Sequence, residues 1–153
     1  MNDNILAVFF ISRKENYAVE ISDVEKIIEY EAPKPIPESS DYLTGVIRYG
    51  DSVLPVIDIN VRFYRKKEED RPTSKILIVN TEILKIGLLV DEVLGISGVQ
   101  PEELETSEAE IYGVAKAYMK GFIKKDKEIT ILLNPERIFS DAQMQELENL
   151  TIS

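Results

Sequence analysis

Two stretches of the chain decide the fold, namely Tyr42–Phe63 (YLTGVIRYGDSVLPVIDINVRF) and Tyr118–Phe139 (YMKGFIKKDKEITILLNPERIF). Each contains an apolar strand, a tight turn and a second apolar strand, which is the pattern of a β-hairpin. Laid on each other without gaps, the two stretches place Gly45 on Gly121 and end in the same aromatic residue. This shared spacing predicts that one all-β unit occurs twice in the chain.

An earlier block repeats in the same order. Tyr17–Val24 (YAVEISDV) aligns with Ile86–Val93 (IGLLVDEV), and each follows a β-branched, apolar run. The hairpins predicted from these runs are Ala7–Ser12 with Tyr17–Ile21 and Lys75–Asn80 with Ile86–Val90. Chance is the alternative, because any two hairpins share apolar alternation and a glycine at the turn. We favour duplication because both blocks recur in the same order.

The remaining segments connect or cover these units. Arg65–Ser74 (RKKEEDRPTS) is charged and is predicted to link the two halves, and Gln100–Glu110 is predicted to be an acidic, solvated loop. A capping box of Ser140 and Gln143 precedes apolar residues at a spacing of three, so a C-terminal amphipathic helix is expected to pack onto its own barrel. Short helical turns are expected at Ser22–Glu25 and after Asn134.

Composition excludes several classes of function. The 153 residues include 28 acidic and 18 basic side chains, a net charge of −10 that disfavours nucleic acid and anionic membrane surfaces as partners. The chain has no His and no Cys, which removes histidine-dependent catalysis, thiol nucleophiles and ordinary zinc sites. We therefore expect no cofactor and no metal. No apolar run approaches the roughly 20 residues of a membrane helix, and the N-terminus has no basic region, so a cytoplasmic location is predicted.

Carboxylates after apolar strands are the remaining chemical candidates. Asp58, Asp91 and Glu92 occupy such positions, and a hydrolase built on a carboxylate pair is one interpretation. Aspartates at strand ends more often cap turns or helices, and we favour that interpretation. No phosphate loop, dinucleotide fingerprint or nucleophile elbow is present in the sequence. By elimination, the chain is expected to be a binding module and not an enzyme.

The sequence resembles the CheW-type chemotaxis coupling proteins over nearly its whole length. The blocks that carry the resemblance are Tyr17–Ile21, Gly45–Ile47, Val53–Ile59, Gly87–Asp91, Tyr118–Gly121 and Ile131–Asn134. The resemblance implies a single CheW-like domain over residues 1–153 made of two intertwined, small, five-stranded β-barrels (SH3-like) related by a pseudo-two-fold axis. Its halves are expected at roughly 14–68 and 75–139, with the N-terminal strand and a C-terminal helix at 140–150 packing across them.

The resemblance also implies partners and sites. Proteins of this family are non-catalytic adaptors that bind the regulatory domain of the chemotaxis histidine kinase and the cytoplasmic tip of chemoreceptors, within membrane-associated arrays. The residues that would contact the kinase are Asp23, Val24 and Lys26. Those that would face the receptor are Lys75, Ile76, Val93 and Arg48. For Val24, Ile76 and Val93, an ordinary place in the core is the alternative, and Gly45 is interpreted as a backbone requirement.

One turn departs from the family pattern. The family has Asn, Arg and Gly at positions occupied here by Arg48, Gly50 and Asp51. If the strand continued through the turn, positions 48 and 50 would share a face, and Arg48 could supply the missing guanidinium. The alternative is a different partner, and a β-barrel interaction module of another two-component pathway is accordingly the second functional hypothesis.

Overall fold

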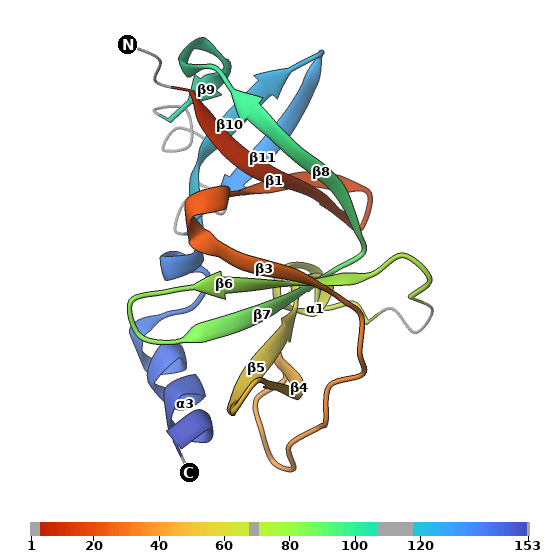
Figure 1. The fold of residues 1–153 in the computed structure, drawn as a ribbon, viewed down its shortest axis with the longest axis vertical. Coiled ribbons are helices and arrows are strands. Elements are labelled where there is room, and N and C mark those ends of the chain that lie inside the picture. Colours follow the sequence, from red (N-terminus) through yellow and green to blue (C-terminus); the bar gives the residue numbers. More distant parts are fainter. Residues whose placement is uncertain (1–3, 68–70, 107–117, 153) are drawn as a thin grey trace.

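The computed structural model describes residues 4–67, 71–106 and 118–152, which form two sheets with a helix beside the second (Figure 1). The first sheet has the strand order β8-β1-β2-β11-β10-β9. Its strands are β1 (Ile5–Ser12), β2 (Glu15–Glu20), β8 (Glu92–Val99), β9 (Leu104–Glu105), β10 (Met119–Lys125) and β11 (Glu128–Leu133).

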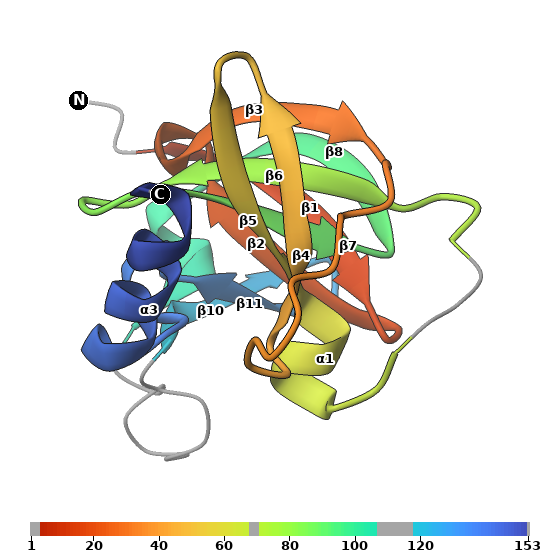
Figure 2. The same ribbon diagram turned by 90° about the horizontal axis from the view of Figure 1, so that it is seen from below.

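The second sheet has the order β3-β6-β7-β5-β4. Its strands are β3 (Val24–Glu29), β4 (Leu43–Tyr49), β5 (Ser52–Asp58), β6 (Lys75–Asn80) and β7 (Lys85–Val90). The helices are α1 (Ile59–Tyr64) and α3 (Asp141–Ile152), with 3₁₀ turns at Ile21–Asp23 (η1), Pro101–Glu103 (η2) and Pro135–Arg137 (η4). Seen from below, α3 runs along one side of the second sheet and α1 follows the end of β5 (Figure 2). The expected all-β fold with short helical turns and a C-terminal helix is confirmed.

Strand alternation explains where the cores lie. Leu77 and Val79 of β6 belong to a central core that both sheets and α3 share, whereas Ile76 and Ile78 point to the other face, into a core of the second sheet alone. The first sheet likewise has a core of its own, which lies around Ala7 and Leu132 on the face turned away from the central core. Because these inner strands are buried on both faces, they are continuous apolar runs.

The strand-pairing registers of the two sheets correspond, as the predicted duplication requires. The parallel pair Val56↔Gly87 in the second sheet corresponds to Leu132↔Ala18 in the first. The antiparallel pair Val24↔Val79 corresponds to Val93↔Phe10, and an irregularity in register follows each pair. Backbone pairing is therefore conserved between the units although few side chains are.

The two aligned glycines lie in equivalent backbone settings. Each follows a shift in register, and a Cβ at Gly45 would lie 2.5 Å from the carbonyl oxygen of Lys34. A Cβ at Gly121 would lie 2.5 Å from the carbonyl oxygen of Glu105. Glycine is needed at both places because the backbone of another segment passes too close for a side chain.

The units are intertwined, so the sheets are not the sequence halves. Of the half 14–68, β2 lies in the first sheet and β3, β4 and β5 in the second; of the half 75–139, β6 and β7 lie in the second and the later strands in the first. The chain crosses between the sheets at η1, which precedes β3, and at Asp91, which precedes β8. The N-terminal strand β1 pairs with both β2 and β8.

Helix caps account for most of the helical segments. Ser140 and Gln143 exchange the two hydrogen bonds of a capping box, and Met144 and Leu147 of α3 are buried in the central core, as predicted. Asn134 accepts a hydrogen bond from the backbone N–H of Glu136 and begins η4. The short turn expected at Ser22–Glu25 is present at Ile21–Asp23, but Ser22 does not cap it, because the turn has no side-chain cap.

Candidate functional site

The edge strand β3 carries the three residues expected to contact a kinase. Asp23 ends η1 and is half-buried, Val24 begins β3 and is half-buried against the central core, and Lys26 is exposed. Within the second sheet β3 pairs only with β6, so its other edge has unpaired backbone groups. An edge of this kind can accept a further strand or an apolar contact from another protein. Val24 thus belongs partly to the core and partly to the surface.

The residues expected to face a receptor are distributed over three strands. Lys75 at the start of β6 forms an ion pair with Glu29, with 2.7 Å between Nζ and Oε2. Val93 lies on β8, an edge strand of the first sheet, and is half-buried against the central core. Ile76 has no exposed surface. Its side chain therefore cannot contact a partner in this conformation, and its burial favours the alternative that it is ordinary core.

Arg48 lies near the end of the β4–β5 hairpin, and its side chain is exposed. Its Nε donates a long hydrogen bond of 3.4 Å to the carbonyl oxygen of Gly50. β4 ends at Tyr49, and Gly50 turns with φ +60°. The strand therefore does not continue through position 50, and the expected shared face of positions 48 and 50 does not form.

A buried polar cluster joins the two sheets where the chain crosses at Asp91. Arg71 donates to Asp58 through Nη2, and its Nη1 lies 3.4 Å from Oδ1 of Asp91. Asp91 also accepts hydrogen bonds from the backbone N–H of Arg13 at 2.9 Å and from Nδ2 of Asn60 at 2.8 Å. We call Arg71, Asp58 and Asp91 the Arg71 cluster. It connects β5, β7 and the β1–β2 turn, which belong to different sheets.

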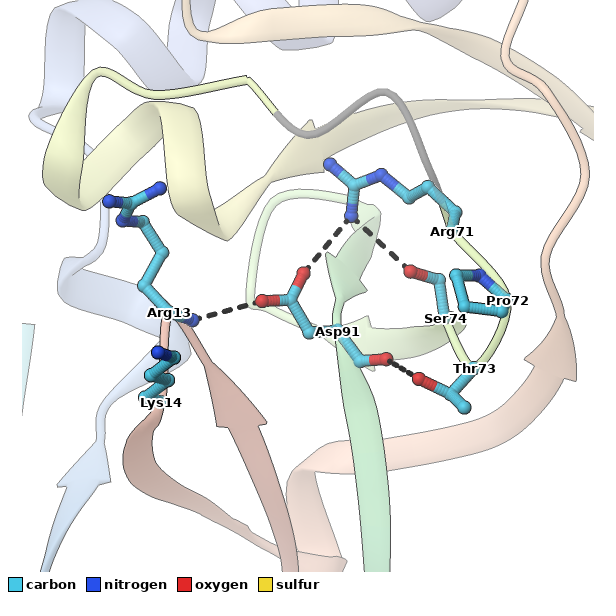
Figure 3. A pocket seen from close by; sticks show the side chains of 7 residues that line it. All are labelled: Arg13, Lys14, Arg71, Pro72, Thr73, Ser74 and Asp91. Atoms are coloured by element: carbon cyan, nitrogen blue, oxygen red, sulfur yellow. Dashed lines mark hydrogen bonds and ion pairs between the residues drawn. The ribbon is translucent and has the colours of Figure 1, made fainter.

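A cavity of about 460 Å³ opens beside this cluster (Figure 3). It is lined by Arg13, Lys14, Arg71, Pro72, Thr73, Ser74 and Asp91. In Figure 3 Asp91 lies between the side chains from the β1–β2 turn and those from the segment before β6. Thr73 contributes a hydrogen bond of 2.8 Å from Oγ1 to the carbonyl oxygen of Asp91. The hydrogen bonds of Arg71 and Thr73 to Asp91 thus hold the segment 71–74 in place.

The surroundings of Asp58 affect its pKa and its role as a helix cap. Burial raises the pKa of Asp58 above its ordinary value, although the Arg71 guanidinium and a hydrogen bond from the Asn60 backbone act in the opposite direction. Oδ1 of Asp58 accepts that hydrogen bond at 2.9 Å and caps α1. Asp58 therefore has the capping role favoured from the sequence.

Two cations that the sequence did not single out, Arg71 and Lys120, occupy the two crossovers. Lys120 of β10 binds Glu20 and Asp23 at the η1 crossover, and we call these three residues the Lys120 cluster. Arg71 lies in the segment predicted to be a plain linker, yet its side chain is 6% exposed. The linker and the strand β10 each contain other cations, so no local feature of the sequence sets Arg71 or Lys120 apart from its neighbours.

Residues 4–67, 71–106 and 118–152 contain neither a metal-binding cluster nor a membrane-spanning helix. Within these ranges no group of three or more metal-ligating side chains converges. Nor does any helix described there have the length and apolar character needed to cross a bilayer. The predicted acidic loop includes residues 107–110, which lie outside the described part of the chain.

The fold and its pseudo-equivalent edge strands β3 and β8 define an all-β interaction module whose halves are intertwined and pseudo-symmetric. A family model described as CheW-like domain matches residues 7–143, so the chain belongs to the CheW-like domain family.

Named relatives agree with this assignment. The chain is 25% identical to "Chemotaxis protein CheW" of Treponema pallidum, with 94% of this chain and 86% of the relative aligned. It is 28% identical to "Probable chemotaxis protein CheW" of Rhizobium etli, with 94% and 92% aligned. The crystal structure of the scaffolding protein TtCheW from Thermoanaerobacter tengcongensis superposes with a TM-score of 0.81 at 26% identity, covering 92% of this chain and 94% of that one.

Proposed function

We propose that this chain is a non-catalytic chemotaxis scaffold that joins chemoreceptors to a histidine kinase. The observation that carries the proposal is the family assignment over residues 7–143 together with a fold that presents two pseudo-equivalent edge strands, β3 and β8. A protein with an edge strand available in each of two sheets can bind two partners at once and hold them in a defined geometry. Its function would then be to hold the two partners in a defined arrangement.

The two edges supply the binding residues of this proposal. Val24 on β3, with Asp23 and Lys26, is the candidate contact for the regulatory domain of the kinase. Val93 on β8 is the candidate contact for the receptor tip, together with Lys75. Val24 and Val93 are pseudo-equivalent, and both are half-buried, as an apolar anchor at the margin of an interface would be.

A scaffold of this kind works in the cytoplasm and is recruited to membrane-associated arrays through the receptor. The carboxylate-hydrolase interpretation is less well supported than the scaffold. Asp58 and Asp91 both contact Arg71, and Asp58 is 2% exposed. A general acid and a general base must both reach a substrate, which the buried carboxylate of Asp58 cannot do.

Substitution of Val24 by Glu tests the proposed kinase edge. A charge placed in a desolvated interface is costly, so we expect binding to the kinase regulatory domain to weaken at least tenfold, equivalent to about 1.4 kcal/mol. Titration calorimetry with that domain measures the loss, and a thermal melt measures the fold. Val53→Glu is the matched control, because Val53 is a 44% exposed valine on β5.

The outcomes separate three interpretations of Val24. Lost binding with an intact melt supports the interface. A collapsed melt assigns Val24 to the core, because a buried charge destabilises the fold. Unchanged binding with an unchanged melt overturns the kinase contact at this position.

The departure at Arg48–Asp51 favours one second candidate, an interaction module of another two-component pathway. A pull-down with the organism's own chemotaxis kinase and receptors distinguishes the two functions. Retention of the kinase supports the chemotaxis scaffold, and its absence from the bound fraction favours the other pathway.

A further inference from the structure

The crossover that leads into β3 is held by a single lysine from another strand. Lys120 extends from β10 of the first sheet, and its Nζ contacts the carboxylate of Glu20 and lies 3.2 Å from Oδ2 of Asp23. Glu20 is the last residue of β2, and Asp23 is the last residue of η1. Lys120 therefore connects the two ends of the crossover Ile21–Asp23.

This crossover has few other fixed points. η1 is one 3₁₀ turn, and it has no side-chain cap at its N-terminus. Its three residues are half-buried at most, so no buried side chain anchors it. A short turn without a cap or a buried anchor is held mainly by its polar contacts. The Lys120 cluster provides such contacts on both sides of the turn.

The charges of the cluster favour a stable arrangement. One ammonium group faces two carboxylates, and the three side chains are 24 to 30% exposed. Partial burial lowers the pKa of Lys120, but the hydrogen bonds to Glu20 and Asp23 outweigh this effect and hold its pKa above the ordinary value. The lysine is therefore charged at neutral pH, and its four-carbon stem spans from β10 to the crossover.

We propose that Lys120 is a positioning residue for the β3 edge: it fixes the crossover Ile21–Asp23 and thereby where Val24 begins the strand. This inference rests on the proposed function, since it assumes that β3 is the edge that binds the kinase. Lys120 touches no partner in the proposal. It acts through Asp23, which directly precedes Val24.

The structure also indicates why loss of Lys120 should affect the β3 edge and not the β8 edge. The residue equivalent to Lys120 in the other unit is Thr44, whose Oγ1 accepts a hydrogen bond of 3.1 Å from the backbone N–H of Asp58. The crossover into β8 is held instead by the Arg71 cluster. Each edge strand therefore has its own fixing cation, and loss of Lys120 leaves the start of β8 untouched.

Lys120→Met tests the proposal, because methionine keeps most of the aliphatic stem and removes the charge. We expect binding to the kinase regulatory domain to weaken about fivefold, a change in the range found for residues that act indirectly. Binding to a soluble receptor-tip fragment is expected to stay within about twofold of the wild type. The Tm is expected to fall by no more than about 3 °C, because the cluster is partly exposed.

Two further variants isolate positioning from general stability. Lys124→Met removes a lysine of the same strand that pairs with Glu105 at 3.5 Å, away from the crossover, and should leave kinase binding unchanged. Lys120→Arg keeps a cation within reach of both carboxylates and should restore most of the affinity. Hydrogen exchange of the β3 amides should be faster in Lys120→Met and unchanged in Lys124→Met.

Each result supports or overturns the proposal. Selective loss of kinase binding in Lys120→Met, with rescue by Lys120→Arg, supports it. The proposal is overturned if Lys120→Met loses affinity for the kinase domain and for the receptor fragment equally, or if the loss of affinity only follows a fall in Tm. It is also overturned if Lys120→Met binds the kinase domain normally while Val24→Glu does not. If Val24→Glu also binds normally with an unchanged melt, the kinase assignment of β3 is the part that fails.

Discussion

The two crossovers between the sheets are built alike but are solvated differently. At Asp91 a cation contacts two carboxylates; the side chains of Arg71 and Asp58 are 6% and 3% exposed, whereas that of Asp91 is 29% exposed. At η1 a cation again contacts two carboxylates, but the side chains of Lys120 and Asp23 are 30% and 28% exposed. The buried pair Arg71–Asp58 therefore distinguishes two clusters with the same charges, and we expect this burial to give the Arg71 cluster the larger effect on stability.

The comparison also shows which features the duplication has kept. Pairing registers correspond between the units, whereas the cation comes from the segment before β6 in one unit and from β10 in the other. Asp58, which caps α1, corresponds to Asn134, which caps η4. Backbone pairing requires only extended chain with suitable alternation, so it persists while the polar side chains change.

Removal of Arg71 should have the largest effect on stability. Arg71→Met leaves Asp58 buried without its cation, which costs about 3 to 5 kcal/mol. For a chain of this length we expect the Tm to fall on the order of 10 °C in a calorimetric melt. Lys120→Met is the control, and a similar fall in both variants would contradict the conclusion that burial separates the two clusters.

Substitution of the aligned glycines Gly45 and Gly121 tests whether the structural equivalence of the two units extends to their hairpins. Gly45→Ala and Gly121→Ala each place a Cβ 2.5 Å from a carbonyl oxygen, so each should lower the free energy of unfolding by about 1 to 3 kcal/mol. Denaturant titration measures both. Gly98→Ala is the control, because its Cβ would meet no atom closer than 3.9 Å. One tolerated and one disruptive substitution would limit the pseudo-symmetry to the strand registers.

The smallest effect concerns the pH dependence contributed by Asp58. Its pKa is raised by burial, so the folded protein retains this proton at pH values where the unfolded chain has released it. The contribution of Asp58 to stability is therefore greatest below its unfolded pKa of about 4 and declines as pH rises through the folded pKa.

Asp58→Asn removes this titration and keeps a side chain that can cap α1, as Asn134 caps η4. We expect the Tm of the wild type minus that of Asp58→Asn to decrease as pH rises from about 4. Melts at a series of pH values measure the difference. An increase with pH would mean that the Arg71 ion pair outweighs burial.

Local pattern was sufficient to predict several elements. The hairpins within 42–63 and 118–139 follow from alternation and turn residues, and α3 follows from the Ser140 capping box and its apolar spacing. The edge strands β3 and β8 were not identified as strands. The sequence of β3 (VEKIIE) is rich in charge, and β8 contains two glycines, so neither shows the apolar run of an inner strand.

The candidate site was predicted less completely than the fold. Asp23, Val24 and Lys26 do lie along one edge, but Ile76 is enclosed in the core of the second sheet. Alternate residues of a strand point to opposite faces, and both faces of β6 are buried. A pattern of this kind cannot distinguish the side chain that faces a partner from the one that faces the core.

The sequence by itself determined the strand periodicity, the duplication and the family, because these depend on residues close together or on a spacing that repeats. Only the tertiary structure showed which strands the halves exchange, and that Arg71 and Lys120 each bind two carboxylates at a crossover. Lys120 and Asp23 are 97 residues apart in sequence. A contact over that separation has no local signature, since it depends on how the sheets pack and on which charges that packing removes from water.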